Sequence, residues 1–471
     1  MSGQAGKSDD LVGFWRGRIG IREKVDSGFE LRLNESGELE MYLWQPILNM
    51  FGYGPAHPTW DGHRLTFEPF QLDLRLQDGK LAGTFPGPGS NVALRRVDSL
   101  PGEKPVPRVR SLSSPRWETR PGGQIYASPV LHGQRAFVGT TGGTMNAINV
   151  ADGSIAWAVP IGKPIFGDAL VDTAQVLFGT DGGELVALAT ADGAERWRYD
   201  LGDEHVGRML PNPNIFDWPE GMTWDHHGVA PVGADGSVFV GGADGSFHAV
   251  DAATGERRWR RRVGGRIRAA AAVAGNMIVV GSTSGRVVAL DRSSGRLRWS
   301  ADAGTPVTSA PVVAGDVVAI GTRGPGLFGF DLRTGTQRWR STFWGSWVES
   351  APAVHDGILY IGASDLRRVS AIKPEDGEVL WRTDVRGWTW GTPFVAGDRI
   401  YAGMAGGRPY FCTHIAGVAV LDRASGRLLA RRPLPEVPGA HQWGIAGSVV
   451  LAGSTLVYAT IEGGVYGLPV E

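Results

Sequence analysis

The chain has 471 residues, of which 42% are hydrophobic and 20% are charged. This composition is typical of a soluble globular protein with room for two or more domains. The formal net charge of −1 removes the electrostatic argument for binding nucleic acid or an anionic membrane, and the single cysteine, Cys412, excludes an intrachain disulfide.

The first ten residues, MSGQAGKSDD, lack the apolar core of a signal peptide. No later stretch approaches the roughly 18 apolar residues of a membrane helix. We therefore expect a cytoplasmic protein with no membrane partner.

Residues 1–97 contain short segments in which apolar and polar residues alternate, the pattern of half-buried strands. The segments are 13–22, 29–35, 38–44, 63–69, 71–77, 80–85 and 91–97. Seven short antiparallel strands predict a small barrel-like domain. The opening Gly13-Phe14-Trp15, followed by a β-meander, resembles the start of calycin (lipocalin-like) barrels. Residues 98–114 are proline-rich and polar, which indicates a linker.

The rest of the chain repeats one phrase. It reads AVDAATGERRW at 249–259, ALDRSSGRLRW at 289–299 and GFDLRTGTQRW at 329–339. Looser copies begin at positions 147, 187 and 371, and a seventh at 420–430 has lost its tryptophan. Each copy predicts a strand end, a turn closed by glycine and a strand that carries a packing tryptophan. The period of about 40 residues, with four strands per unit, is typical of propeller blades.

The number of blades follows from the inner strands, which begin near Ser128, Asp168, Ala230, Ala270, Ala310, Ala351, Thr392 and Ser448. Only seven outer strands follow these eight inner strands. The strand around Trp117 can supply the missing one and so close the ring. We therefore predict an all-β protein, with an eight-bladed propeller over 115–471 closed by an N-terminal strand.

The repeated phrase A-x-D-x-x-T-G-x-x-x-W resembles the tryptophan-docking motif of the PQQ-type (quinoprotein-like) β-propellers. That resemblance implies either a quinoprotein dehydrogenase or a member without cofactor, such as an outer-membrane assembly scaffold. If the chain were one of the dehydrogenases, the resemblance would imply three features: a vicinal cysteine pair, a calcium or lanthanide site and a secretory signal. Because this chain has one cysteine, a PQQ-dependent oxidoreductase is the lesser alternative. We expect no cofactor and no metal.

Three insertions interrupt the repeat, at 203–228, within 403–420 and within 431–448. Alternate connections of a four-stranded blade emerge on the same face, so all three should decorate one mouth of the channel. The register of the blades predicts that the innermost mouth positions are Tyr126, Phe166, His227 or Gly228, Arg268, Thr308, Glu349, Trp390 and Ala446.

The mouth combines ionisable groups with an aromatic wall. Its candidate catalytic residues are Asp168, Asp225, His226, His227, Arg268 and Glu349. Its candidate binding residues are Tyr126, Phe166, Trp224, Trp347, Trp388, Trp390, Tyr410, Phe411 and Trp443.

Two functions fit this mouth. The first is a cofactor-independent lyase, isomerase, cyclase or hydrolase of specialised metabolism, acting on a hydrophobic or aromatic small molecule. His226 or His227 would exchange protons with it, together with Glu349 or Asp168. The alternative is a non-catalytic propeller that binds a protein, peptide or small-molecule partner.

Overall fold

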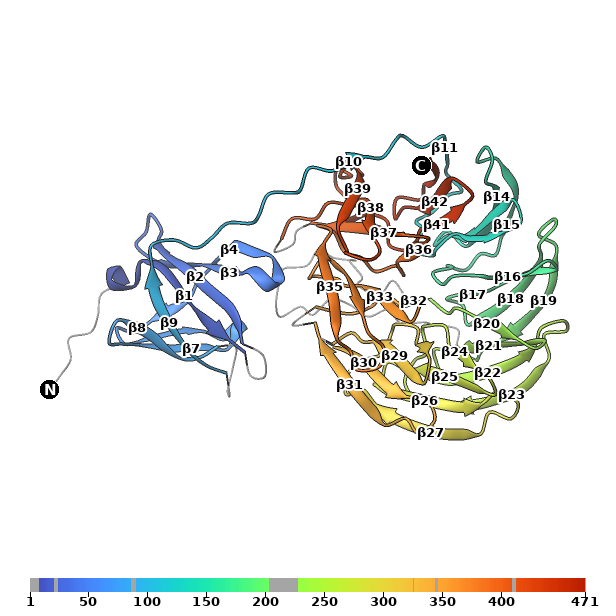
Figure 1. The fold of residues 1–471 in the computed structure, drawn as a ribbon, viewed down its shortest axis with the longest axis horizontal. Coiled ribbons are helices and arrows are strands. Elements are labelled where there is room, and N and C mark those ends of the chain that lie inside the picture. The colour runs from blue at the N-terminus through green and yellow to red at the C-terminus, as the bar shows by residue number, and fades with distance from the viewer. Residues whose placement is uncertain are drawn as a thin grey trace. The chain divides into compact units, whose positions relative to one another are not determined.

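The computed structural model describes residues 8–20, 24–85, 90–202, 228–324, 326–343, 346–408 and 412–470. The chain divides into two compact units between Pro107 and Arg108 (Figure 1). Within the described ranges the helices are short 3-10 turns, η1 (Ser8–Leu11), η2 (Pro46–Leu48) and η3 (Glu68–Phe70). None of these is long and apolar enough to cross a membrane.

The first unit is a curled, antiparallel nine-stranded sheet in the order β4-β3-β2-β1-β9-β8-β7-β6-β5. Its strands are β1 (Gly13–Ile19), β2 (Val25–Leu33), β3 (Leu39–Gln45), β4 (Met50–Ala56), β5 (Thr59–Trp60), β6 (Arg64–Phe67), β7 (Leu72–Gln77), β8 (Lys80–Thr84) and β9 (Asn91–Val97). Pairing of β1 with β9 joins the two ends of this unit. The sequence pattern predicts no strand between segments 38–44 and 63–69, but β4 and β5 lie there. The sheet is barrel-like, and its calycin-like character stays a prediction.

The alternation of side chains explains how this sheet folds. Phe29 and Leu31 on β2 are fully buried, as is Met41 on β3. Arg32 and Tyr42, which directly follow Leu31 and Met41, point to the opposite face, because successive side chains of a strand alternate. One face of the sheet therefore forms the core of the unit and the other is available for contacts.

The second unit is an eight-bladed propeller, in which each blade is an antiparallel sheet (Figure 1). Blade 1 comprises β12 (Val130–His132), β13 (Arg135–Gly139), β14 (Thr144–Asn149) and β15 (Ile155–Pro160). Blade 2 comprises β16 (Leu170–Val171), β17 (Gln175–Gly179), β18 (Glu184–Ala189) and β19 (Glu195–Asp200). Blade 3 comprises β20 (Val232–Ala234), β21 (Ser237–Gly241), β22 (Ser246–Asp251) and β23 (Arg257–Arg262). Blade 4 comprises β24 (Ala272–Ala274), β25 (Met277–Gly281), β26 (Arg286–Asp291) and β27 (Leu297–Asp302).

The second half of the ring repeats this pattern. Blade 5 comprises β28 (Val312–Ala314), β29 (Val317–Gly321), β30 (Gly326–Asp331) and β31 (Gln337–Thr342). Blade 6 comprises β32 (Ala353–His355), β33 (Ile358–Gly362), β34 (Arg368–Ile372) and β35 (Val379–Asp384). Blade 7 comprises β36 (Phe394–Ala396), β37 (Arg399–Gly407), β38 (Gly417–Asp422) and β39 (Leu428–Pro433). Blade 8 comprises β41 (Val450–Ala452), β42 (Thr455–Ala459) and β43 (Val465–Pro469), and β11 (Trp117–Thr119) is its outer strand.

The ring closes as the sequence predicts. Strand β11 pairs antiparallel with β43, and Trp117 lies opposite Gly467. The chain therefore enters the last blade before it builds the first. Closure removes the open sheet edge that an unclosed propeller would present.

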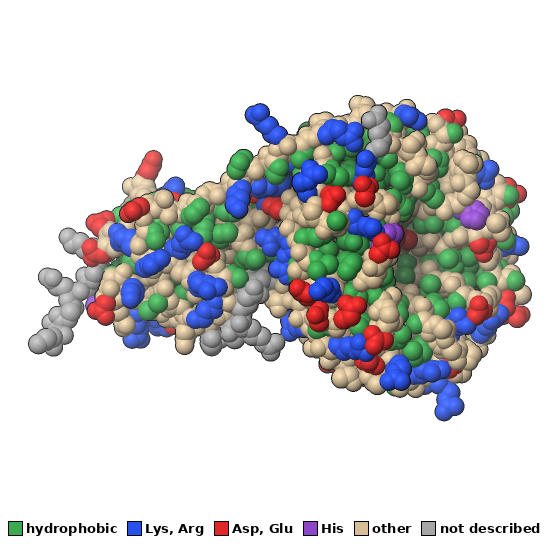
Figure 2. All heavy atoms as spheres, in the orientation of Figure 1, with side chains coloured by type: hydrophobic (Ala, Val, Ile, Leu, Met, Phe, Trp, Pro, Cys, Tyr) green, Lys and Arg blue, Asp and Glu red, His purple; other side chains and the backbone are tan. Residues whose placement is uncertain are grey.

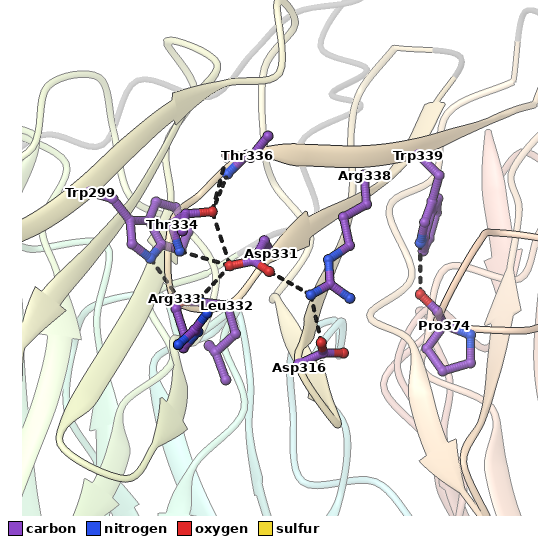
Figure 3. Close-up of polar contacts among 10 residues, drawn as sticks. All are labelled: Trp299, Asp316, Asp331, Leu332, Arg333, Thr334, Thr336, Arg338, Trp339 and Pro374. Atoms are coloured by element: carbon purple, nitrogen blue, oxygen red, sulfur yellow. Dashed lines mark hydrogen bonds and ion pairs between the residues drawn. The ribbon is translucent and has the colours of Figure 1, made fainter.

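The repeated phrase is a device that docks each blade to the next (Figure 3). Asp331 accepts hydrogen bonds from the backbone of the turn that follows it, including the N–H of Thr334 at 2.9 Å. Gly335 closes the turn with φ +74°. The Trp299 ring packs on this glycine so closely that an added Cβ would lie 2.5 Å from the ring, and its indole donates to the carbonyl of Leu332 at 2.8 Å. The glycine thus serves both the turn and the docking.

The junction between blades 7 and 8 is built differently. Ala430 stands where the other outer strands carry tryptophan, and β10 (Arg110–Ser111) pairs in parallel with β39 beside it. Leu112, next to β10, is 7% exposed and shares an apolar cluster with Ala430 and Tyr458. Residues from the stretch that the sequence places in the linker therefore cover the junction that lacks a tryptophan.

Candidate functional site

A cavity of about 140 Å³ lies where the inner strands begin. Each blade contributes to it one of the positions aligned by register, which are Tyr126, Phe166, Gly228, Arg268, Thr308, Glu349, Trp390 and Ala446. The spacing of the repeats thus identified a ring of residues that are far apart in sequence but meet on the propeller axis.

Polar side chains of the cavity link neighbouring inner strands. An Asp168 carboxylate oxygen accepts a hydrogen bond of 2.6 Å from the backbone N–H of Ser128. The Ser128 hydroxyl oxygen accepts one of 2.8 Å from the backbone N–H of Ser448. The Ser448 hydroxyl oxygen in turn accepts the N–H of Thr392 at 3.0 Å. Asp168 therefore takes part in a belt of hydrogen bonds that runs across four blades.

Glu349, the candidate proton donor, forms a buried ion pair. Its carboxylate lies 2.7 Å from Nε of Arg323, and the two side chains are 1% and 6% exposed. The same guanidinium lies over the Trp347 ring, 4.5 Å from its centroid. Arg323 follows β29, and nothing in its local sequence marks it as a partner of Glu349. This arrangement holds both the carboxylate and Trp347 in place.

The aromatic residues of the cavity fall into two pairs. Tyr126 and Phe166, from adjacent blades, stack with ring centroids 5.4 Å apart, and both are half-buried. Trp390 is 6% exposed, stacks on Trp388 at 4.9 Å and donates its indole N–H to the Ser364 hydroxyl at 3.1 Å. The first pair thus presents more of its aromatic surface than the second.

Three of the candidate binding tryptophans do not line the cavity. Trp388 is fully buried, with its ring 4.0 Å from that of His414, and Trp443 is 2% exposed. Trp347 is half-buried beneath its arginine. Burial lowers the pKa of His414 well below its usual range. These residues pack the mouth loops together.

Two of the insertions meet on one face of the propeller. Strand β37 runs on to Gly407 and pairs with β40 (Gln442–Gly444), with Ala405 opposite Gly444. The parity of the blade connections predicted that these two insertions emerge on the same side, and their pairing confirms it. The candidate residues Trp224, Asp225, His226, His227, Tyr410 and Phe411 lie outside the described residues.

The residues around the cavity do not suit a quinone cofactor. Small-molecule sites usually offer about 300–1,000 Å³, which is more than the 140 Å³ found here. The vicinal cysteine pair cannot form, because Cys412 is the one cysteine of the sequence. Among the described residues there is also no group of three His, Cys, Asp or Glu side chains placed to hold a metal ion.

Comparison with known proteins identifies the family. The family model described as outer membrane protein assembly factor BamB matches residues 111–210, 216–347 and 327–413. The chain belongs to this family. A curated relative of the same description, from Burkholderia pseudomallei (strain K96243), is 34% identical over 113 residues. That match covers 24% of this chain and 26% of the relative, so it spans about a quarter of the relative's length.

Solved structures share the propeller. BamB from Moraxella catarrhalis aligns with a TM-score of 0.56 and 19% identity, over 77% of this chain and 100% of that one. The computationally designed Ika8 protein aligns with a TM-score of 0.58 and 16% identity, over 76% and 100%. A europium-containing methanol dehydrogenase aligns with a TM-score of 0.55 and 13% identity, over 73% and 84%.

At these identities the solved structures show the fold alone, since the same propeller serves an assembly factor and a dehydrogenase. The expected PQQ-type propeller is confirmed. Neither the family nor these relatives supports the expectation of a cofactor-independent enzyme acting on a small molecule.

Proposed function

We propose that this chain is a non-catalytic scaffold that binds a protein partner at the mouth of its propeller. The observation that carries the proposal is the rim formed by Tyr126 and Phe166. The two rings stack on each other and remain half-buried, whereas Glu349 and Asp168 are held in internal contacts. Aromatic side chains on a rigid frame are the usual anchors of protein interfaces.

The dimensions of the mouth also favour binding of a protein partner. A cavity of about 140 Å³ can admit one apolar side chain of a partner but is small for an enclosed substrate. Acidic and basic side chains are interspersed on the visible surface (Figure 2). The name of the family, an outer-membrane assembly factor, also favours protein binding.

The proposal can be tested with a photo-cross-linking amino acid in place of Tyr126. Gln134 is the matched control, because it is exposed in the turn between β12 and β13, at the other end of the blade's inner strand. We expect a discrete cross-linked protein at position 126 and none at position 134. The purified partner should then bind the Phe166→Ala variant at least tenfold more weakly. Equal cross-linking at both positions, or none at position 126, would contradict the proposal.

A further inference from the structure

A second cavity, of about 350 Å³, lies on the outer face of the N-terminal sheet, away from its core. The strand register brings its lining together, because Glu30 on β2 lies opposite both Phe14 on β1 and Tyr42 on β3. In the next row Trp44 lies opposite Phe51 on β4. Four aromatic side chains from three strands thus form one groove, which we call the aromatic groove.

Two arginine side chains pack against aromatic rings of the groove. Gly28 lies opposite both Arg16 and Trp44, and because it has no side chain, the Arg16 guanidinium reaches to 5.1 Å from the indole centroid. Arg32 lies 4.5 Å from the centroid of Tyr42 and is held by two bonds to Glu30, of 2.7 and 2.6 Å. Arg32 and Arg16 each pair with an acidic side chain, so the groove favours a neutral ligand.

Part of the chain itself lies in the aromatic groove. Leu100, Pro101 and Gly102, which we call the strap, form one of its walls. The indole N–H of Trp44 donates to the carbonyl oxygen of Pro101 at 2.7 Å, and Trp44 is 4% exposed. Segments rich in proline keep their carbonyls free of internal hydrogen bonds and lose little entropy when they dock. Aromatic grooves with a suitable donor are a recurrent means of recognising them.

The strap leaves much of the groove open. The cavity of about 350 Å³ remains beside it, and Phe14, Tyr42 and Phe51 are half-buried. Pro101 and Gly102 are themselves exposed, so another segment can replace them without unfolding the sheet. The strap thus shows how the groove holds one proline, and the open part is where a longer ligand would continue.

We propose that the aromatic groove binds an extended, proline-containing segment of a partner protein, which replaces the strap. The ligand has an apolar residue before its proline, as Leu100 precedes Pro101, and a free carbonyl for the Trp44 indole. This site is separate from the propeller mouth, and either can exist without the other.

The test uses the full chain and a fluorescent peptide of the strap sequence, SLPGEKPVP (residues 99–107). A Leu100→Ser/Pro101→Gly double variant loosens the strap, and binding is followed by anisotropy. We expect this variant to bind the peptide at least tenfold more tightly than the wild-type chain. Adding Trp44→Phe, which removes the indole donor, should lower the affinity at least tenfold. Adding Trp60→Phe should not, because Trp60 lies on β5, outside the groove.

Three results would overturn the proposal. The first is a folded double variant that binds the peptide no better than the wild-type chain, and the second is equal weakening by Trp60→Phe. The third is a wild-type dimer that Trp44→Phe dissociates, since the groove would then hold the strap of a second copy. If the double variant fails to fold, the wild-type chain is used instead. Its Trp44 indole N–H resonance is assigned by NMR through its loss in Trp44→Phe. This resonance must shift when the peptide is added. An unchanged resonance at millimolar peptide also overturns the proposal.

Discussion

The indole nitrogen of Trp117 donates a hydrogen bond of 2.8 Å to the carbonyl oxygen of Val150, which joins the last blade of the propeller to the first. The ring also packs against Gly153, where an added Cβ would lie 2.6 Å from it. The same geometry recurs within the ring, for instance from Trp259 to Arg292 at 3.0 Å. At Trp117, however, the contact closes the ring, because β11 belongs to blade 8 but precedes blade 1 in the chain.

Replacing Trp117 by alanine should strongly destabilise the propeller. The side chain is 8% exposed, and truncation of a buried tryptophan typically costs about 3–5 kcal/mol. Trp117→Phe keeps most of the ring but loses the hydrogen bond, which contributes about 1 kcal/mol. Denaturant titration of both variants measures the difference. Leu297→Ala on an outer strand, 44% exposed, is the control and should change stability by about 0.5 kcal/mol or less. If Trp117→Ala matches that control, the closing contact does not stabilise the ring.

Leu112→Ala should destabilise the junction of blades 7 and 8. Leu112 is buried in the cluster that contains Ala430, so its truncation leaves a cavity and should cost about 2–5 kcal/mol. Val106→Ala is the matched control, because Val106 is 41% exposed. Urea denaturation of the two variants provides the measurement, and equal midpoints would show that the stretch beside β10 adds no stability.

Glu349→Gln should lower the stability of the propeller. It removes the carboxylate that faces Arg323 in a nearly dry environment, and breaking a buried pair on one side costs about 3–5 kcal/mol. The double variant Glu349→Gln/Arg323→Met should recover part of this loss, because the buried charge is then removed as well. Melting temperatures of the single and double variants test this. A single variant that melts like the wild type would show that the pair of Glu349 and Arg323 does not stabilise the propeller.

The stability of the chain should fall as the pH drops from about 6.5 to 4. Burial, together with the charge of Arg260, lowers the pKa of His248 to about 4, and its ring is hydrogen-bonded to the Tyr199 hydroxyl at 2.9 Å. The unfolded chain binds a proton near pH 6.5, whereas the folded chain does so only near pH 4. The unfolded state therefore holds more protons in this window, and the loss at this site reaches about 3 kcal/mol.

His248→Gln removes this titration, so the stability of the variant should fall less than that of the wild type between pH 6.5 and 4. Denaturant midpoints measured at half-unit steps of pH provide the comparison. His414, whose pKa burial also lowers, should add to the loss in both proteins. Parallel pH profiles of the wild type and the His248 variant would contradict the prediction.

Much of the candidate site could be predicted because the repeats are regular. Once the tryptophans set the register, the positions of Tyr126, Phe166, Arg268, Glu349 and Trp390 around one cavity followed. Burial could not be predicted in the same way. An unrepeated loop tryptophan can face a ligand or pack its own loop, and the choice depends on contacts with strands that are distant in sequence. For Trp388, the ring of His414 and the backbone of Ala405 provide those contacts.

The sequence by itself determined the blade number, the closing strand and the docking role of the tryptophans, because each is a local pattern repeated at a constant interval. The tertiary structure alone decided what the irregular segments do. A two-residue strand such as β10 has no periodicity to detect, and its pairing depends on the unpaired edge of β39. The partner of Glu349 and the strap on Trp44 were likewise decided by packing between separate elements, since burial and hydrogen-bond geometry exist only once those elements meet.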